Sequence, residues 1–164
     1  MASSEPVKFN RLCAVLDGEA DRAAVRRALK ALEKELVEQG RPGRLKEIAG
    51  GYQLLTAPEY GKYVKKLRDD GSKRKDQGLS KAALETLAVI AYKQPVKRMD
   101  VEAIRGVSVG DIIRALIERD LVKVVGREDS IGKPLLYGTT GRFLKQFGLK
   151  SLKSLPDPAE LSLD

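Results

Sequence analysis

The run GREDSIGKP, residues 126–134, contains the residue types that a phosphate-binding loop needs, and an apolar run that predicts a strand precedes it. A phosphate-binding loop requires four residues between its glycines, a Ser or Thr after the Lys, and a helix that begins there. Here five residues separate Gly126 from Gly132, Pro134 takes the place of the hydroxyl residue, and a second strand is expected next. We therefore interpret the run as the loop, or wing, between two strands.

Two pairs of neighbouring acidic residues, Asp69-Asp70 and Glu128-Asp129, are candidates for acid–base catalysis, which carboxylates and lysines can perform without histidine. Both pairs lie among Gly, Ser, Lys and Arg, where we expect neither burial nor a fixed partner to shift the pKa of a carboxyl. We interpret both pairs as solvated loop charges. The sequence predicts no catalytic residue.

The chain has no histidine and only one cysteine, Cys13, so it can form neither an internal disulfide nor a Cys/His metal cluster. Cys13 is expected to be a buried core thiol. Without a nucleophile, a metal-ligand set or a glycine-rich cofactor loop, the protein is predicted not to be an enzyme and to need no metal or cofactor. No apolar run approaches the ~18 residues of a membrane span, and a signal-peptide hydrophobic region is absent, so we expect a soluble, cytoplasmic protein.

The charged run RDDGSKRKDQG divides the 164 residues into two halves. It contains two glycines and no apolar residue, which is typical of a linker. The net charge of the chain is +8, and residues 62–75 alone carry seven basic and two acidic groups. The predicted division is a first domain at 1–67, the linker at 68–79, a second domain at 80–148 and a C-terminal tail at 149–164.

In the first half, helical spacing of apolar residues predicts a long helix that Asp21 caps and Gly40 ends. Residues 45–57 predict two short strands about a Gly50-Gly51 turn, a dipeptide that accepts positive φ. A short helix is expected from Pro58, with Tyr60 and Tyr63 facing inward. The apolar positions of the long helix are Val25, Ala28, Leu29, Leu32 and Leu36.

In the second half, the sequence predicts a helix that Ser80 caps and Pro95 stops, then a short helix that Asp100 caps and Gly106 ends. Ser108 is expected to open a longer helix. Strands at 121–126 and 134–140 should follow, and Phe143 and Phe147 share one face of a closing helix. Helices followed by a two-stranded hairpin therefore occur twice. They predict a mainly α protein with small β-hairpins (α+β), built from two tandem winged-helix domains.

The longer helix, 109–119, takes the place in which a winged helix contacts DNA bases. Such a helix brings Lys, Arg, Asn or Gln to base edges. Here Arg114 and Arg119 are balanced by Asp111 and Glu118, and Asp111 lies in the first turn, where a base contact is normally made. We predict that this helix does not read DNA sequence.

A basic stripe on the first-half helix is the better candidate for non-specific DNA contact. Arg22, Arg26 and Lys30 are spaced at i, i+4 and i+8, and Arg27 widens the stripe. An ordinary solvated helix face explains the same residues, so both interpretations stay open. A winged-helix DNA-binding transcriptional regulator is the alternative function that such a stripe would serve.

Several motifs of the second half occur together in one known family: LETLAVIAYKQPV, EAIRGV, GREDSIGKPLLYGTT and FGLKSL. AGGYQLLTAPEY, at 49–60, is similar to the first wing of the same family. On these residues the chain resembles the segregation and condensation protein B (ScpB) family, closely over 79–156. SSEPVKFNRLCAVL aligns after the family's first helix, a stretch of about fifteen residues, so the first domain is expected to lack that helix. An upstream start, trimming of the chain or real divergence would each explain this.

The resemblance implies a non-enzymatic subunit made of two winged helices that forms a homodimer largely through the first. It also implies binding to the kleisin ScpA and, through ScpA, to the SMC ATPase that organises chromosomes at the nucleoid. We expect the kleisin contacts at exposed polar and turn residues of the best-matching motifs. These candidates are Tyr92, Gln94, Pro95, Arg105 and Gly106. Each of them also has a simple folding role as its alternative, such as ending a helix.

Overall fold

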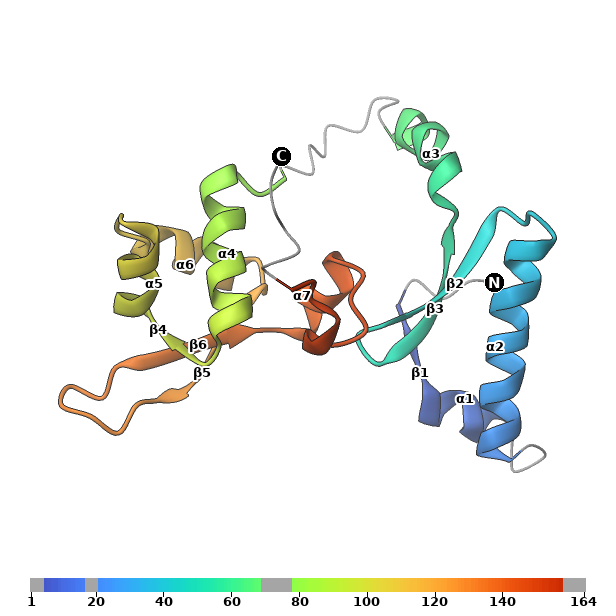
Figure 1. Cartoon of the computed structure of the whole chain (residues 1–164), viewed down its shortest axis with the longest axis horizontal. Coiled ribbons are helices and arrows are strands. Elements are labelled where there is room, and N and C mark those ends of the chain that lie inside the picture. The colour runs from blue at the N-terminus through green and yellow to red at the C-terminus, as the bar shows by residue number, and fades with distance from the viewer. Residues whose placement is uncertain (1–4, 17–20, 69–77, 158–164) are drawn as a thin grey trace. The chain divides into compact units, whose positions relative to one another are not determined.

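A computed structural model describes residues 5–16, 21–68 and 78–157 of the chain. The chain forms two compact units, Met1–Asp76 and Gln77–Asp164. Each unit combines helices with one three-stranded antiparallel sheet (Figure 1), which confirms the predicted α+β class. The winged-helix fold and the four predicted domain ranges stay predictions, and most of the predicted linker, 69–77, lies outside the described residues.

The first unit is built around a sheet with the strand order β1-β3-β2. Its elements are β1 (Val7–Lys8), α1 (Phe9–Val15), α2 (Arg22–Glu38), β2 (Gly43–Ile48), β3 (Gly51–Thr56), the 3-10 turn η1 (Pro58–Tyr60) and α3 (Gly61–Arg68). Among the described residues, no helix precedes β1.

The second unit repeats this plan after one additional helix, and its sheet has the equivalent order β4-β6-β5. Its elements are α4 (Lys81–Lys93), β4 (Val96–Lys97), α5 (Arg98–Arg105), α6 (Gly110–Glu118), β5 (Val122–Arg127), β6 (Leu135–Thr139), α7 (Gly141–Gln146) and the 3-10 turn η2 (Leu152–Ser154).

The repeat is visible in residue identity as well as in the order of elements. The tripeptide Pro-Val-Lys occurs in both units, at 6–8 and at 95–97, and its Val and Lys form the first strand of each. Val7 pairs with Tyr52, and the equivalent Val96 pairs with Tyr137. The same Val–Tyr pair therefore joins β1 to β3 and β4 to β6.

Among the described residues, the extensive hydrophobic core lies in the second unit. Each large aliphatic side chain buried there contributes about 1.5–3 kcal/mol. In the first unit, by contrast, Val25 is the one position of the predicted apolar face of α2 that is buried, whereas Ala28 and Leu32 are exposed. The largest fully buried hydrophobic side chains are Leu87, Ile90, Val101, Val109, Leu116, Leu121 and Val122, all in the second unit.

The first hairpin turns one residue earlier than predicted. Ile48 pairs with Gly51, so the two loop residues are Ala49 and Gly50, with φ values of 49° and 69°. Gly51 is instead a buried strand residue, and a Cβ there would lie 3.0 Å from the carbonyl oxygen of Val7. Glycine is therefore needed at 51 because β1 packs closely against it, and not because of the turn.

The predicted helix ends at Gly40, Ser80, Pro95 and Gly106 agree with the structure, whereas three predicted caps differ in detail. The Ser80 hydroxyl accepts a hydrogen bond from the Ala83 amide at 3.2 Å, and Gly106 ends α5 with a φ of 67°. Asp21 occupies the N-cap position of α2 but makes no side-chain capping bond. Asp100 lies inside the first turn of α5, and Ser108 lies two residues before α6 begins.

Three side chains predicted to be buried are more accessible than expected. Cys13 is half-buried, and Tyr60 and Tyr63 are exposed. Within the described ranges, no helix is long and apolar enough to cross a membrane. Across the same residues, no cluster of three or more Cys, Asp or Glu side chains is placed to hold a metal ion.

Candidate partner-binding site

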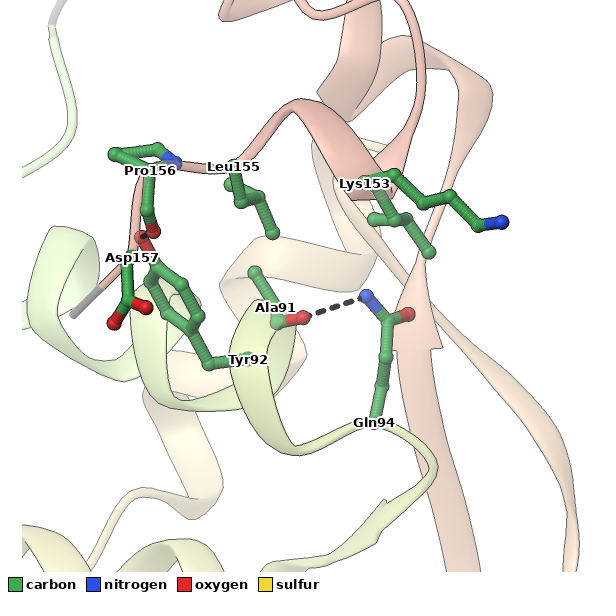
Figure 2. Close-up of a pocket in the computed structure, with 8 residues that line it drawn as sticks. Ala91, Tyr92, Gln94, Lys153, Leu155, Pro156 and Asp157 are labelled. Atoms are coloured by element: carbon green, nitrogen blue, oxygen red, sulfur yellow. Dashed lines mark hydrogen bonds between the residues drawn. The ribbon is translucent and has the colours of Figure 1, made fainter.

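An open pocket of about 490 Å³ lies between the end of α4 and the segment that follows α7. Figure 2 shows Tyr92 and Gln94 on α4 and at its end, with Leu155 and Pro156 opposite them. Two of the five predicted contact residues therefore line the pocket. The complete lining is Ala91, Tyr92, Gln94, Leu152, Lys153, Leu155, Pro156 and Asp157.

The far wall of the pocket is a segment that we call the C-terminal strap, residues 149–157. The Tyr92 hydroxyl donates a hydrogen bond to the Pro156 carbonyl oxygen at 2.8 Å. Leu149 and Leu155 pack against the hydrophobic core, whereas Leu152 is exposed. The prediction of a plain tail missed these pocket residues. The signal was in the sequence, because LKSLKSLP repeats Leu every third residue, the period of the 3-10 helix that η2 forms.

Gln94 uses its side-chain amide inside the fold. Its Nε2 donates to the Ala91 carbonyl oxygen at 2.9 Å, and its Oε1 accepts from the Thr139 amide at 2.8 Å. These bonds join the end of α4 to β6. Pro95 follows through a cis peptide bond and is exposed. Of the three candidates at this end of α4, Pro95 is exposed, whereas Tyr92 and Gln94 are half-buried.

Arg105 ties the end of α5 to the N-terminal half of α4. Its guanidinium contacts the Ala82 carbonyl oxygen at 3.1 Å, the Thr86 hydroxyl at 3.2 Å and a Glu85 carboxylate oxygen at 2.7 Å. Its side chain is only 13% exposed. Tyr92 lies six residues beyond Thr86, or about 9 Å further along the helix axis. Arg105 and the neighbouring Gly106 therefore belong to a second group, apart from Tyr92, Gln94 and Pro95.

A carboxylate of the chain itself occupies the N-terminus of α6. Glu102 accepts hydrogen bonds from the Val109 amide at 3.0 Å and from the Ser108 hydroxyl at 3.3 Å. The bond from the Val109 amide is the main cause that lowers the pKa of Glu102. Asp111 adds a second, fully exposed carboxylate in the first turn. Because helix N-termini attract anions, these two carboxylates take the place that a DNA phosphate would need.

Two of the four predicted DNA-contact residues are held against α1. The Arg22 and Arg26 guanidinium groups lie 5.1 Å and 4.9 Å from the centre of the Phe9 ring. Arg22 also donates to the Asn10 side-chain oxygen at 2.9 Å. Arg27 and Lys30 are exposed on α2. The predicted basic stripe therefore consists of one pair that supports helix packing and one pair that is directed to solvent.

Glu128 has two fixed partners, contrary to the sequence prediction. Its carboxylate pairs with the Lys97 ammonium at 3.1 Å and accepts from the Ser130 hydroxyl at 2.8 Å. The Ser130 bond, followed by the Lys97 bond, lowers the pKa of Glu128, and the bond with Glu128 raises the pKa of Lys97. The prediction failed because β4 and β6 are neighbours in the sheet, which brings Lys97 to the wing loop.

Comparisons with known proteins agree with the sequence resemblance. A family model described as segregation and condensation complex subunit ScpB matches residues 1–158. Segregation and condensation protein B of Syntrophotalea carbinolica is 44% identical over 161 residues, which cover 98% of this chain and 79% of that protein. The protein of the same name from Halalkalibacterium halodurans is 45% identical over 152 residues, with coverages of 93% and 75%.

A crystal structure of ScpB from Mycobacterium tuberculosis aligns with 90% of this chain and 88% of its own, at 35% identity and a TM-score of 0.43. The family match spans nearly the whole chain, and the identities exceed 40% over most of each relative. The chain belongs to the segregation and condensation protein B family.

Proposed function

We propose that the chain is a non-enzymatic subunit that binds the kleisin ScpA and, through ScpA, the SMC ATPase. In that role it supports chromosome condensation and segregation during cell division, in the cytoplasm at the nucleoid. The observation that carries the proposal is the match of residues 1–158 to a family of condensation-complex subunits. A subunit of a complex acts by binding other subunits, so the function is expected on a protein-binding surface.

The pocket beside Tyr92 is the proposed kleisin contact. Tyr92 supplies ring surface to it, and Leu152 and Leu155 of the strap supply apolar surface opposite. Pro95 does not line the pocket but is exposed three residues after Tyr92, and it is proposed as a neighbouring contact. Small, largely apolar hollows with a few polar groups suit an apolar side chain of a partner segment. Gln94, Arg105 and Gly106 are proposed as supporting residues, since their hydrogen bonds and backbone geometry hold α4, α5 and β6 together.

Co-purification with the kleisin of the same genome tests the proposal. The two proteins should elute together at moderate salt, and Tyr92→Ala should weaken their affinity about tenfold or more, as expected for an aromatic contact residue. Lys93→Ala is the matched control, because Lys93 is the exposed neighbour of Tyr92 and does not line the pocket. A soluble kleisin that elutes separately from the wild-type chain would refute the proposal.

We also propose homodimerisation through the first unit. Support comes from large apolar side chains that are exposed there, among them Leu32 and Val37 on α2 and Leu54 and Leu55 on β3. Exposed apolar surface of this kind is typical of an interface. Sedimentation equilibrium should give twice the chain mass, and Leu32→Ser should shift the equilibrium toward the monomer. A wild-type chain that remains monomeric at high concentration would contradict the proposed homodimer.

The alternative of a DNA-binding transcriptional regulator gains no support from the family. It is also disfavoured by chemistry, because Glu102 and Asp111 place negative charge at the end of α6 that would approach DNA. Contact with DNA is proposed only as weak and non-specific, through the exposed basic residues of α2.

A further inference from the structure

Helix α3 and the turn η1 before it carry an apolar stripe that is exposed to solvent. Tyr60, Tyr63, Val64 and Leu67 follow the i, i+3, i+4, i+7 spacing that puts side chains on one face of a helix. Tyr63 is 55% exposed and Leu67 is 77% exposed. The main neighbour of α3 is η1, the turn directly before it, and Figure 1 shows α3 beyond the end of β3, away from α1.

The equivalent helix of the second unit shows that such a stripe can be buried. Helix α7 also follows the last strand of its hairpin, and its Phe143 is only 3% exposed within the core. Leu144 packs against the same core. The two helices occupy the same place in the repeated plan, yet only α7 has a covered face. An isolated helix of eight residues is marginal in water, so a covering partner would stabilise α3.

Positive charge flanks the stripe and indicates the chemistry of its partner. The segment Gly61–Arg68 contains four basic residues and no acidic one. Lys62 lies with its ammonium 5.0 Å from the centre of the Tyr63 ring. Lys65 and Lys66 are exposed, and no carboxylate within the described ranges pairs with either of them. A complementary surface would be apolar in its centre and acidic at its edges.

We propose that α3 docks an acidic amphipathic helix of a protein partner. Leucine-like side chains of that helix cover Tyr63, Val64 and Leu67, and its carboxylates pair with the flanking lysines. A nucleic acid would neutralise the lysines but would leave Val64 and Leu67 in water. A second copy of α3 would bring lysines against lysines, which is repulsive. The apolar stripe and the charge together therefore favour an acidic helix.

Fluorescence anisotropy with the full chain tests this proposal. The probe is a labelled synthetic 18-residue helix with Leu at i, i+3, i+4 and i+7 and Glu on both sides of that stripe. We expect saturable binding that weakens with salt. Leu67→Ser should reduce the affinity about tenfold, the effect of losing one buried leucine contact. The double charge reversal Lys65→Glu with Lys66→Glu should reduce it at least as much. Val15→Ser, on an exposed residue of α1, should leave binding unchanged.

Four outcomes would overturn the proposal. A control peptide whose leucines are replaced by serine binds equally well, which would show that charge alone causes the binding. Leu67→Ser leaves binding of the acidic peptide unchanged. A 20-base-pair duplex binds more tightly than the peptide, and Leu67→Ser abolishes that binding. Sedimentation equilibrium shows that Leu67→Ser dissociates a dimer, which would make a second copy the occupant. None of these outcomes depends on the kleisin, so the proposal can fail independently of the proposed function.

Discussion

Replacing Glu102 with glutamine should destabilise the second unit near neutral pH but have little effect in acid. The Val109 amide bond holds the pKa of Glu102 below its ordinary value of 4.5, so folding favours the carboxylate. That stabilisation is present above about pH 4.5 and is lost as the pH falls through the lower folded pKa. Urea unfolding at pH 7 and pH 3 measures the difference. Glu118→Gln, an exposed change at the end of α6, should have no effect at either pH. An equal loss at both pH values for Glu102→Gln would contradict the assignment.

Gly51→Ala should lower the free energy of unfolding by about 1–3 kcal/mol, the usual cost of overpacking. The new Cβ would meet backbone atoms of Pro6 and Val7 at 3.0–3.1 Å, and a backbone atom cannot turn aside as a side chain can. Gly61→Ala is the control, because a Cβ at this first position of α3 meets nothing within 4 Å. Chemical denaturation should show no loss for the control. If Gly51→Ala proves as stable as the wild type, β1 does not pack on β3 as described.

At the scale of elements, Arg105 should matter more for holding α5 against α4 than for binding a partner directly. Arg105→Ala removes contacts to Ala82, Thr86 and Glu85 and should cost about 1.5–3 kcal/mol, the range for hydrogen bonds to a charged group. Arg105→Lys should recover only part of this, since one ammonium cannot replace the guanidinium fork. Urea unfolding and kleisin affinity are both measured. Unchanged stability together with lost affinity would instead make Arg105 a direct contact.

The sequence predicted both hairpins and most of the helices, but not the short strands β1 and β4 that make each sheet three-stranded. It also predicted the ends and faces of the elements less well. The α+β class, the cap at Ser80 and the end at Gly106 follow from local rules, since each depends on neighbouring residues alone. Gly51 was misplaced because its role depends on β1, 44 residues earlier. Tyr63 was expected inside because helical spacing shows which residues share a face and not whether anything covers it.

The candidate site was predictable to a similar extent. Tyr92 and Gln94 were selected from the sequence and do line one pocket, but the strap that completes it was taken for a tail. The strap was missed because the contact between Tyr92 and Pro156 spans 64 residues. Arg105 shares a motif with Gly106 and looked like surface, whereas its partners on α4 are about twenty residues earlier in the chain. Long-range partners are not visible in local patterns.

At the scale of the whole molecule, the net charge of +8 should give only weak, salt-sensitive binding to DNA, without sequence preference. The double variant Arg27→Ala with Lys30→Ala should make the plot of log affinity against log salt concentration less steep, by up to about 2 in slope. Each lost phosphate contact removes roughly one released counterion. Arg22→Ala with Arg26→Ala should mainly lower the stability of the first unit, because both guanidinium groups pack on Phe9. Anisotropy with a 20-base-pair duplex between 50 and 300 mM salt, together with urea unfolding, separates the two double variants. Sequence preference that survives at high salt would favour the regulator alternative over a subunit that reaches the chromosome through protein partners.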